Sequence, residues 1–216
     1  MVNKTKTAFT LAEVLITLVI IGIVAALTIP TAINNYRKHE YYSAFKKTYS
    51  TLLQATNKIF AEHGSPNASI GGWASLSGDV KNMYKKYLNA KDCTVANDCF
   101  AQYKIRGPKY ISGDNYTQKD FWQSHVGFVL SDGTQIVVAQ FSSSCNYHNH
   151  RCFEFWTDIN GQKGPNQWGR DVFVYAVTEN GFEYDFSGSV DCDPNGSNKV
   201  GYGCAAKLLR ENAMNY

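Results

Sequence analysis

Six cysteines, all after residue 92, are the residues of this 216-residue chain whose chemistry is easiest to anticipate. An even number of cysteines in a chain of this size is typical of an oxidising compartment. Pairing each cysteine with its neighbour along the chain would close three short, polar, turn-rich loops. The pairs would be Cys93–Cys99, Cys145–Cys152 and Cys192–Cys204. Because six cysteines allow many pairings, the sequence favours this local scheme without deciding it.

The second of these loops also contains the ligand types of a zinc site. His148 and His150 lie between Cys145 and Cys152, and two thiolates with two imidazoles form a known tetrahedral set. The segment lacks the closely spaced pair of cysteines that structural zinc sites use. We therefore expect a disulfide here and keep zinc as the alternative.

Oxygen-bearing side chains gather in the glycine-rich segment 158–171, which could suit a hard cation such as calcium. The candidate ligands are Asp158, Asn160, Asn166 and Asp171. The segment opens like an EF-hand loop, but Lys163 stands where that loop needs glycine and Gly169 where it needs glutamate. The alternative is a loop whose Asp and Asn side chains cap their own turns. The sequence therefore allows calcium but requires no cofactor.

Neither an enzyme nor a nucleic-acid-binding protein is indicated. The sequence has no Gly-x-Ser-x-Gly, no phosphate-binding glycine loop and no His-Glu-x-x-His, and its five histidines are scattered. The formal net charge is +3, and Lys4 and Lys6 in the first eight residues account for two of those charges. A nearly neutral remainder offers no surface for following a phosphate backbone.

The element that must position everything else is the apolar N-terminal segment. Residues 9–29 would form a helix of about 31 Å, roughly the thickness of the hydrocarbon core of a membrane. The lysines before it favour a cytoplasmic N-terminus. A cleaved secretory signal, with Ala25 and Ala26 near the cut, or a plain anchor would explain the apolar run. Neither explains Glu13, since a carboxylate in such a helix usually has a partner.

The run Ala8-Phe9-Thr10-Leu11-Ala12-Glu13 resembles the processing motif of type IV prepilins and type II secretion pseudopilins. In that family a short basic leader is cut before an aromatic residue, which becomes N-methylated. Glutamate then holds the fifth mature position and proline often the twenty-second. These positions correspond to Phe9, Glu13 and Pro30. The departure is Ala8, where the family usually has glycine, and it puts the rate of cleavage in doubt.

The resemblance implies a structural subunit that polymerises into a type II secretion pseudopilus or a type IV pilus. Glu13 would neutralise the new amino group of a neighbouring subunit, which is reasonable chemistry for a carboxylate in a bilayer. Implied partners are identical or related subunits, the prepilin peptidase and methylase, the inner-membrane assembly platform and membrane lipid. The implied location is the cytoplasmic membrane, with the head outside the cytoplasm, followed by an extracytoplasmic filament.

After Pro30 the pattern becomes that of an amphipathic helix, which Gly64 would end. Pro30 itself should bend or locally melt the helix. Apolar and aromatic residues recur every three or four positions at Tyr41, Phe45, Tyr49, Leu52, Thr56 and Ile59. Beyond it we expect a short helix over 80–88 and strands at 126–130, 134–141, 153–157, 172–178 and 182–186. Turns at Asp132-Gly133 and Asn180-Gly181 would make two hairpins.

These elements predict an α+β fold in which a long N-terminal helix packs on a small antiparallel sheet, as in pilins. The expected organisation is a leader at 1–8, a transmembrane and polymerisation helix at 9–30, an amphipathic stalk at 31–63 and a head at 64–216. The competing functional hypothesis is a membrane-tethered, extracytoplasmic ligand-binding module.

Overall fold

The computed structural model describes residues 9–93, 100–103, 107–115, 126–139, 141–147, 150–183, 192–196 and 199–216. Its chain divides into two compact units, Met1–Glu40 and Tyr41–Tyr216. The long helix α1, Leu11–His63, contributes to both units. The second unit is the head.

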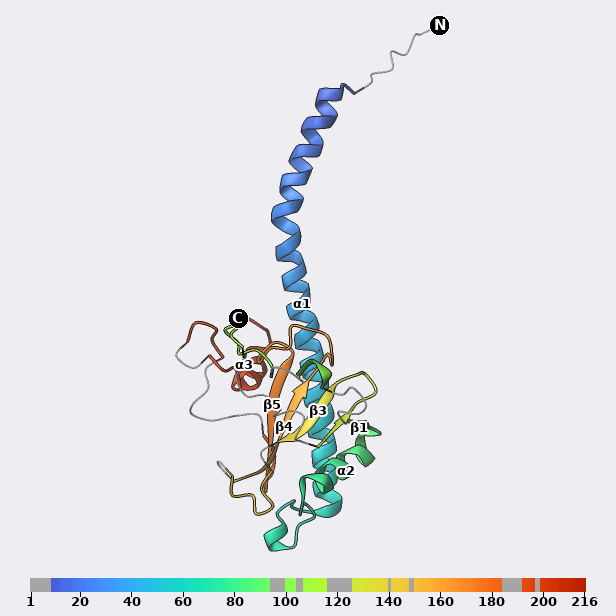
Figure 1. Cartoon of the computed structure of the whole chain (residues 1–216), viewed down its shortest axis with the longest axis vertical. Helices are drawn as coiled ribbons and strands as arrows, with labels where there is room; N and C mark the ends of the chain where they lie inside the picture. Colours follow the sequence, from blue (N-terminus) through green and yellow to red (C-terminus); the bar gives the residue numbers. More distant parts are fainter. Residues whose placement is uncertain are drawn as a thin grey trace. The chain divides into compact units, whose positions relative to one another are not determined.

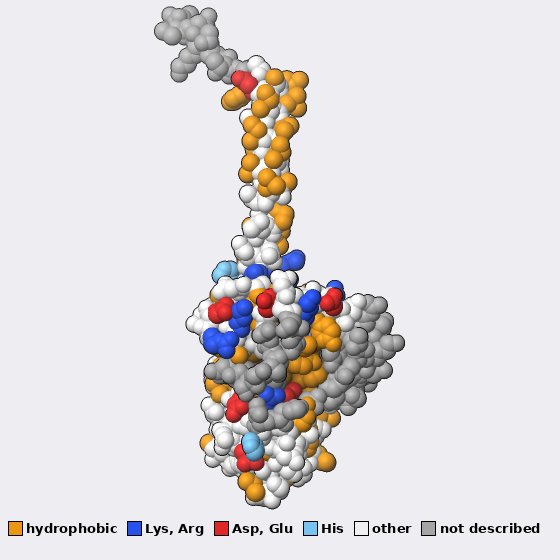
Figure 2. All heavy atoms as spheres, turned by 90° about the vertical axis from the view of Figure 1, so that its left-hand side faces the viewer, with side chains coloured by type: hydrophobic (Ala, Val, Ile, Leu, Met, Phe, Trp, Pro, Cys, Tyr) orange, Lys and Arg blue, Asp and Glu red, His pale blue; other side chains and the backbone are white. Residues whose placement is uncertain are grey.

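The described part of the first unit is the N-terminal part of α1. Helical structure runs through Pro30 without a break, so of the two effects predicted at this proline, a bend or local melting, the melting does not occur. Large apolar side chains all along this part of the helix are exposed, and Figure 2 shows those on one of its faces. The described residues of this unit therefore have no hydrophobic core of their own.

The head contains a sheet whose six described strands follow one another in chain order, each antiparallel to the next. The strands are β1 (Lys91–Cys93), β2 (Gly127–Val129), β3 (Gln135–Ala139), β4 (Arg151–Asp158), β5 (Val172–Thr178) and β6 (Gly181–Glu183). In the central pair, β4 and β5, Phe155 lies opposite Tyr175. The helices of the head are the C-terminal part of α1, α2 (Ser77–Leu88) and α3 (Cys204–Glu211), with 3₁₀ turns η1 (Ala68–Ile70) and η3 (Ala101–Tyr103).

One face of the sheet packs against the helices (Figure 1). Phe45 of α1 lies on the ring of Phe173 at 4.7 Å between centroids, and Tyr84 of α2 meets Phe155 at the same distance. The side chains of Phe45 and Tyr84 are fully buried. This aromatic layer fixes the helices on the sheet, since each such side chain removes a large apolar area from water.

The opposite face of the sheet has a second, smaller core. Alternate residues of the same strands, such as Val137, Trp156 and Val174, point to this side and pack with Trp168 and Tyr103. Both faces of the central strands are therefore buried, which explains why β5 reads as a continuous apolar run, Val-Phe-Val-Tyr-Ala-Val.

The α+β prediction is confirmed, and most elements lie where the sequence placed them. α1 ends at His63 and Gly64 follows with a positive φ of 73°, its amide bonded to the Phe60 carbonyl. β5 has the predicted bounds, and β4 extends beyond them at both ends. The sequence did not predict β1 or α3. α3 carries a signal that could have been found, since Cys204, Ala205 and Leu208 share one buried face.

Candidate functional site

The start of α1 is a capping box built from Thr10 and Glu13. The Thr10 amide and hydroxyl both donate to Glu13 Oε2, at 2.8 and 2.9 Å, and the Glu13 amide donates to Thr10 Oγ1 at 3.3 Å. This reciprocal arrangement satisfies amides that the first helical turn leaves without partners. The Thr-x-x-Glu spacing is a known sequence signal for it, which the sequence analysis did not use. Glu13 therefore caps its own helix and remains exposed.

The surface of α1 after this cap is suited to hydrocarbon. Among the described residues, α1 is the one helix long and apolar enough to cross a membrane. Two threonines of its apolar run, Thr17 and Thr28, donate their hydroxyls to the carbonyls of Val14 and Val24, both at 2.9 Å. A polar group that is satisfied within its own helix can enter a bilayer at reduced cost. Phe9, with 87% of its surface exposed, lies directly before the helix.

Two of the three disulfides expected from the sequence are present: Cys145–Cys152 and Cys192–Cys204. The first excludes the zinc alternative in this state, because its two cysteines have no thiolate left to bind a metal. Cys93 is disulfide-bonded as well. Cys99, its predicted partner, and His148 of the zinc alternative lie outside the described residues, as does Ala8 of the processing motif.

The loop that joins β4 to β5 brings together the four candidate calcium ligands. Both carboxylates are fully buried. Asp171 accepts hydrogen bonds from the amides of Asn166 and Gln167, at 2.8 and 2.7 Å, and from the Asn160 side chain at 3.2 Å. Burial raises the pKa of Asp171 to about 6, against the effect of these bonds.

Asp158 is held in the same way, accepting from the Asn160 amide at 3.2 Å and from the Tyr103 hydroxyl at 2.6 Å. All four carboxylate oxygens of the two aspartates thus accept at least one hydrogen bond from the protein. The side-chain oxygens of Asn160 and Asn166 are buried and accept none. Within the described ranges no group of three or more His, Cys, Asp or Glu side chains could hold a metal ion. Calcium is thus unsupported, and the geometry matches the self-capping alternative.

Comparison with known proteins addresses the N-terminal motif first. The profile of the prokaryotic N-terminal methylation motif matches residues 3–29. Over nearly its whole length the chain is also similar to the type IV major pilin protein PilA of Myxococcus xanthus (strain DK1622). The two are 26% identical over 215 residues, which covers 88% of this chain and 96% of that protein. Both matches support a type IV pilin or pseudopilin family for this chain. No solved structure matches it.

The structure places the predicted functional residues as follows. Phe9 and Glu13 lie four residues apart at the start of an exposed apolar helix, and Pro30 lies within that helix. The calcium candidates and the two disulfides belong to the head. The predicted processing and assembly residues thus lie on an exposed helix, while the two aspartates of the head loop are hydrogen-bonded within the protein.

Proposed function

We propose that this chain is cleaved before Phe9, N-methylated there, and assembled through its apolar helix into a helical filament. The observation that carries the proposal is the all-round apolar surface of residues 9–33, which the described part of the chain leaves uncovered. Such a surface is costly in water and stable only in lipid or against other apolar helices. The N-terminal methylation motif supports the same assignment.

Between the two kinds of filament, we favour a type IV pilus over a type II secretion pseudopilus. The similar protein of Myxococcus xanthus is a type IV major pilin, and the similarity covers the head as well as the motif. The proposed role is structural and uses no cofactor. Its partners would be further copies or relatives of this chain, the prepilin peptidase and methylase, and the inner-membrane assembly platform.

Cleavage is tested by intact-mass and N-terminal analysis of the protein from membranes of cells with and without the prepilin peptidase. A chain that begins at N-methylated Phe9 only when the peptidase is present is the expected result. A chain that begins near Leu27 would mean an ordinary secreted protein. A chain that retains Met1 in both strains would favour the tethered ligand-binding module instead.

Assembly is tested by substitution of Glu13. We expect Glu13→Ala to insert into the membrane but to fail to enter filaments, because a neighbouring subunit's amino group loses its counter-charge in a medium of low dielectric constant. Glu40→Ala is the matched control, since Glu40 is an exposed carboxylate on the same helix. Sheared-filament yield and carbonate-resistant membrane retention are the two measurements.

A second control separates the capping role of Glu13 from its proposed role between subunits. Thr10→Ala removes the capping box but keeps the carboxylate. Loss of a helix cap costs about 1 kcal/mol, which a helix of this length tolerates. We therefore expect Thr10→Ala to assemble. If Thr10→Ala and Glu13→Ala fail equally, the glutamate acts only through its own helix.

A further inference from the structure

The cations of the head are unevenly partnered. Lys47 pairs with Asp132, Lys81 and Lys85 with Asp92, and Arg151 with Glu154. Lys58 and Lys86 lie over the ring of Tyr87. A second group has no carboxylate partner among the described residues: Lys109, Lys163, Arg170, Lys199, Lys207 and Arg210. Outside this second group, the described cations of the head that lack a carboxylate partner are Lys46, Lys58, Lys86 and Lys91.

Contacts of the neighbouring residues place this second group at one end of the head, which we call the basic end. The Lys109 amide donates to the Asn166 carbonyl, and the Ile111 amide to the Val200 carbonyl next to Lys199. The C-terminal Tyr216 joins the remaining parts, since its hydroxyl donates to the Gly169 carbonyl at 2.5 Å and Lys207 lies 5.5 Å from the centre of its ring.

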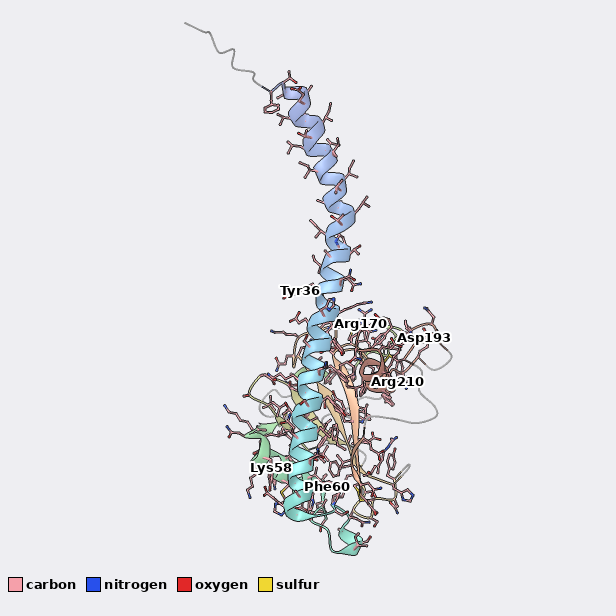
Figure 3. The ribbon with its side chains drawn as sticks, turned by 180° about the vertical axis from the view of Figure 1, so that it is seen from behind. Tyr36, Lys58, Phe60, Arg170, Asp193 and Arg210 are labelled. Carbon is pink, nitrogen blue, oxygen red and sulfur yellow. A yellow bond between two sulfur atoms is a disulfide. The ribbon has the colours of Figure 1, made fainter. Side chains whose placement is uncertain are left out.

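The basic end is also where α1 enters the head. The Tyr41 hydroxyl donates to the Gly164 carbonyl at 3.4 Å, and the Tyr42 hydroxyl to Asn212 Oδ1 at 3.3 Å. Lys46, over the ring of Tyr42 at 5.5 Å, adds a seventh cation. Figure 3 shows Arg170 and Arg210 together near this end, with Lys58 toward the other end of the head.

The charge of the basic end is positive after its anions are counted. The described anionic groups among these segments are the exposed side chains of Asp114, Asp193 and Glu211 and the C-terminal carboxylate of Tyr216. Asp158 and Asp171 are buried and held within the loop. Among the described residues of these segments, seven cations against four anions leave three positive charges.

We propose that the basic end binds anionic phospholipid headgroups of the membrane that holds the subunit. Tyr41 lies eleven positions after Pro30, about 17 Å at the rise of a helix, so the surface is tied to the membrane segment by a short covalent link. Each lysine or arginine near an anionic leaflet raises the equilibrium constant for binding to that leaflet about fivefold. This inference needs only membrane anchoring and is independent of filament assembly.

The test uses the full-length chain in nanodiscs of phosphatidylcholine alone or with phosphatidylglycerol, read by hydrogen–deuterium exchange. Anionic nanodiscs are expected to slow exchange in residues 163–170 and 206–212, and added salt to reverse the effect, because these surface charges are screened. Lys109→Gln/Lys163→Gln/Arg210→Gln should remove the protection. All three side chains are exposed, so the fold should be unaffected.

The matched control is Lys58→Gln/Lys86→Gln/Lys91→Gln, which removes the same charge from exposed lysines outside the basic end. It should keep the protection. Equal exchange in neutral and anionic nanodiscs would overturn the proposal, as would equal losses in both triple variants. Protection that appears in detergent without lipid and grows with protein concentration would also overturn it, by identifying a second copy of the chain as the occupant.

Discussion

Two buried hydroxyl groups between α1 and α2 show how single atoms hold the head together. The Thr56 hydroxyl donates to the Leu52 carbonyl at 2.8 Å, so its oxygen is left to accept from the Tyr84 hydroxyl at 2.6 Å. Both side chains are fully buried, and burial raises the pKa of Tyr84 well above its ordinary value. Because Thr56 donates to Leu52 and accepts from Tyr84, removing the Thr56 hydroxyl and removing the Tyr84 hydroxyl should have different costs.

Thr56→Val should therefore be more destabilising than Tyr84→Phe. The valine leaves the Tyr84 O–H buried without an acceptor, which costs about 1–3 kcal/mol, whereas the phenylalanine leaves Thr56 bonded to Leu52. Urea unfolding of the full-length chain in detergent measures both variants. The double variant should recover part of the loss of Thr56→Val. Equal losses for the two single variants would contradict this donor order.

Asp171 gives the head an unusual pH response. Its pKa in the folded protein is about 6, above the ordinary 3.8, because burial outweighs the amides that bond to it. The folded state therefore binds the proton more tightly than the unfolded state does. Its stabilising contribution is complete below pH 3.8 and is lost as the pH rises through 6.

Relative to Asp171→Asn, the wild-type chain should gain up to about 3 kcal/mol of unfolding free energy as the pH falls from 7 to 4. Asp132→Asn provides a control of opposite sign. Burial raises the pKa of Asp132, but hydrogen bonds from Lys47 and Thr134 outweigh it and lower the pKa overall. The unfolding free energy of the wild type relative to Asp132→Asn should decrease as the pH falls. Parallel curves for the wild type and Asp171→Asn would contradict the prediction.

At the scale of elements, the β4–β5 loop and α3 depend on each other. Gly169 has a φ of 79° and lies against the Cys192–Cys204 disulfide, so that a Cβ on it would come within 2.4 Å of Cys204 Sγ. Glycine is required here both by backbone conformation and by space. The same loop accepts the Tyr216 hydroxyl at the Gly169 carbonyl. This contact region joins the C-terminus to the sheet.

Gly169→Ala should lower the unfolding free energy by about 1–3 kcal/mol more than Gly133→Ala does. Gly133 has a similar φ of 91° but open space around its Cα, so the backbone cost of about 1–2 kcal/mol is common to both. Thermal unfolding of the two variants under non-reducing conditions measures the difference. Equal shifts would mean that α3 moves away from the loop at little cost.

At the scale of the whole molecule, the two units differ in whether their apolar side chains are buried or exposed. The head buries both faces of its sheet, whereas the described part of residues 9–40 exposes its apolar side chains. Membrane retention should therefore depend on the composition of the helix and not on the folding of the head.

Phe45→Ala separates these two properties. Removing this fully buried ring from its contacts with Phe173 and Tyr175 should cost the head about 3–5 kcal/mol. The variant should still be retained in membranes. Tyr36→Ala, at a residue with 71% of its surface exposed, is the control and should leave the head protease-resistant. Limited proteolysis of membrane vesicles measures both membrane retention and the protease resistance of the head. Release of the Phe45→Ala chain from the membrane would show that retention depends on the folding of the head.

The sequence by itself determined the apolar helix, its end at Gly64 and most of the sheet, and it favoured the two observed disulfides without deciding them. These features depend on local physics: a periodicity of 3.6 or 2, a glycine with positive φ, or a loop short enough to favour pairing of nearby cysteines. The family motif is local as well, since its residues lie within one helical segment. A linear pattern contains all the information that such features need.

Only the tertiary structure decided how distant polar groups are used. Asp158 and Asp171 looked like cation ligands until Tyr103 and the amides of Asn166 and Gln167 were found to bond to them. The basic end likewise combines α1, the β4–β5 loop and α3, which are far apart in the sequence. Whether a charge is buried, paired or exposed depends on contacts that folding brings together, and no spacing along the chain specifies them.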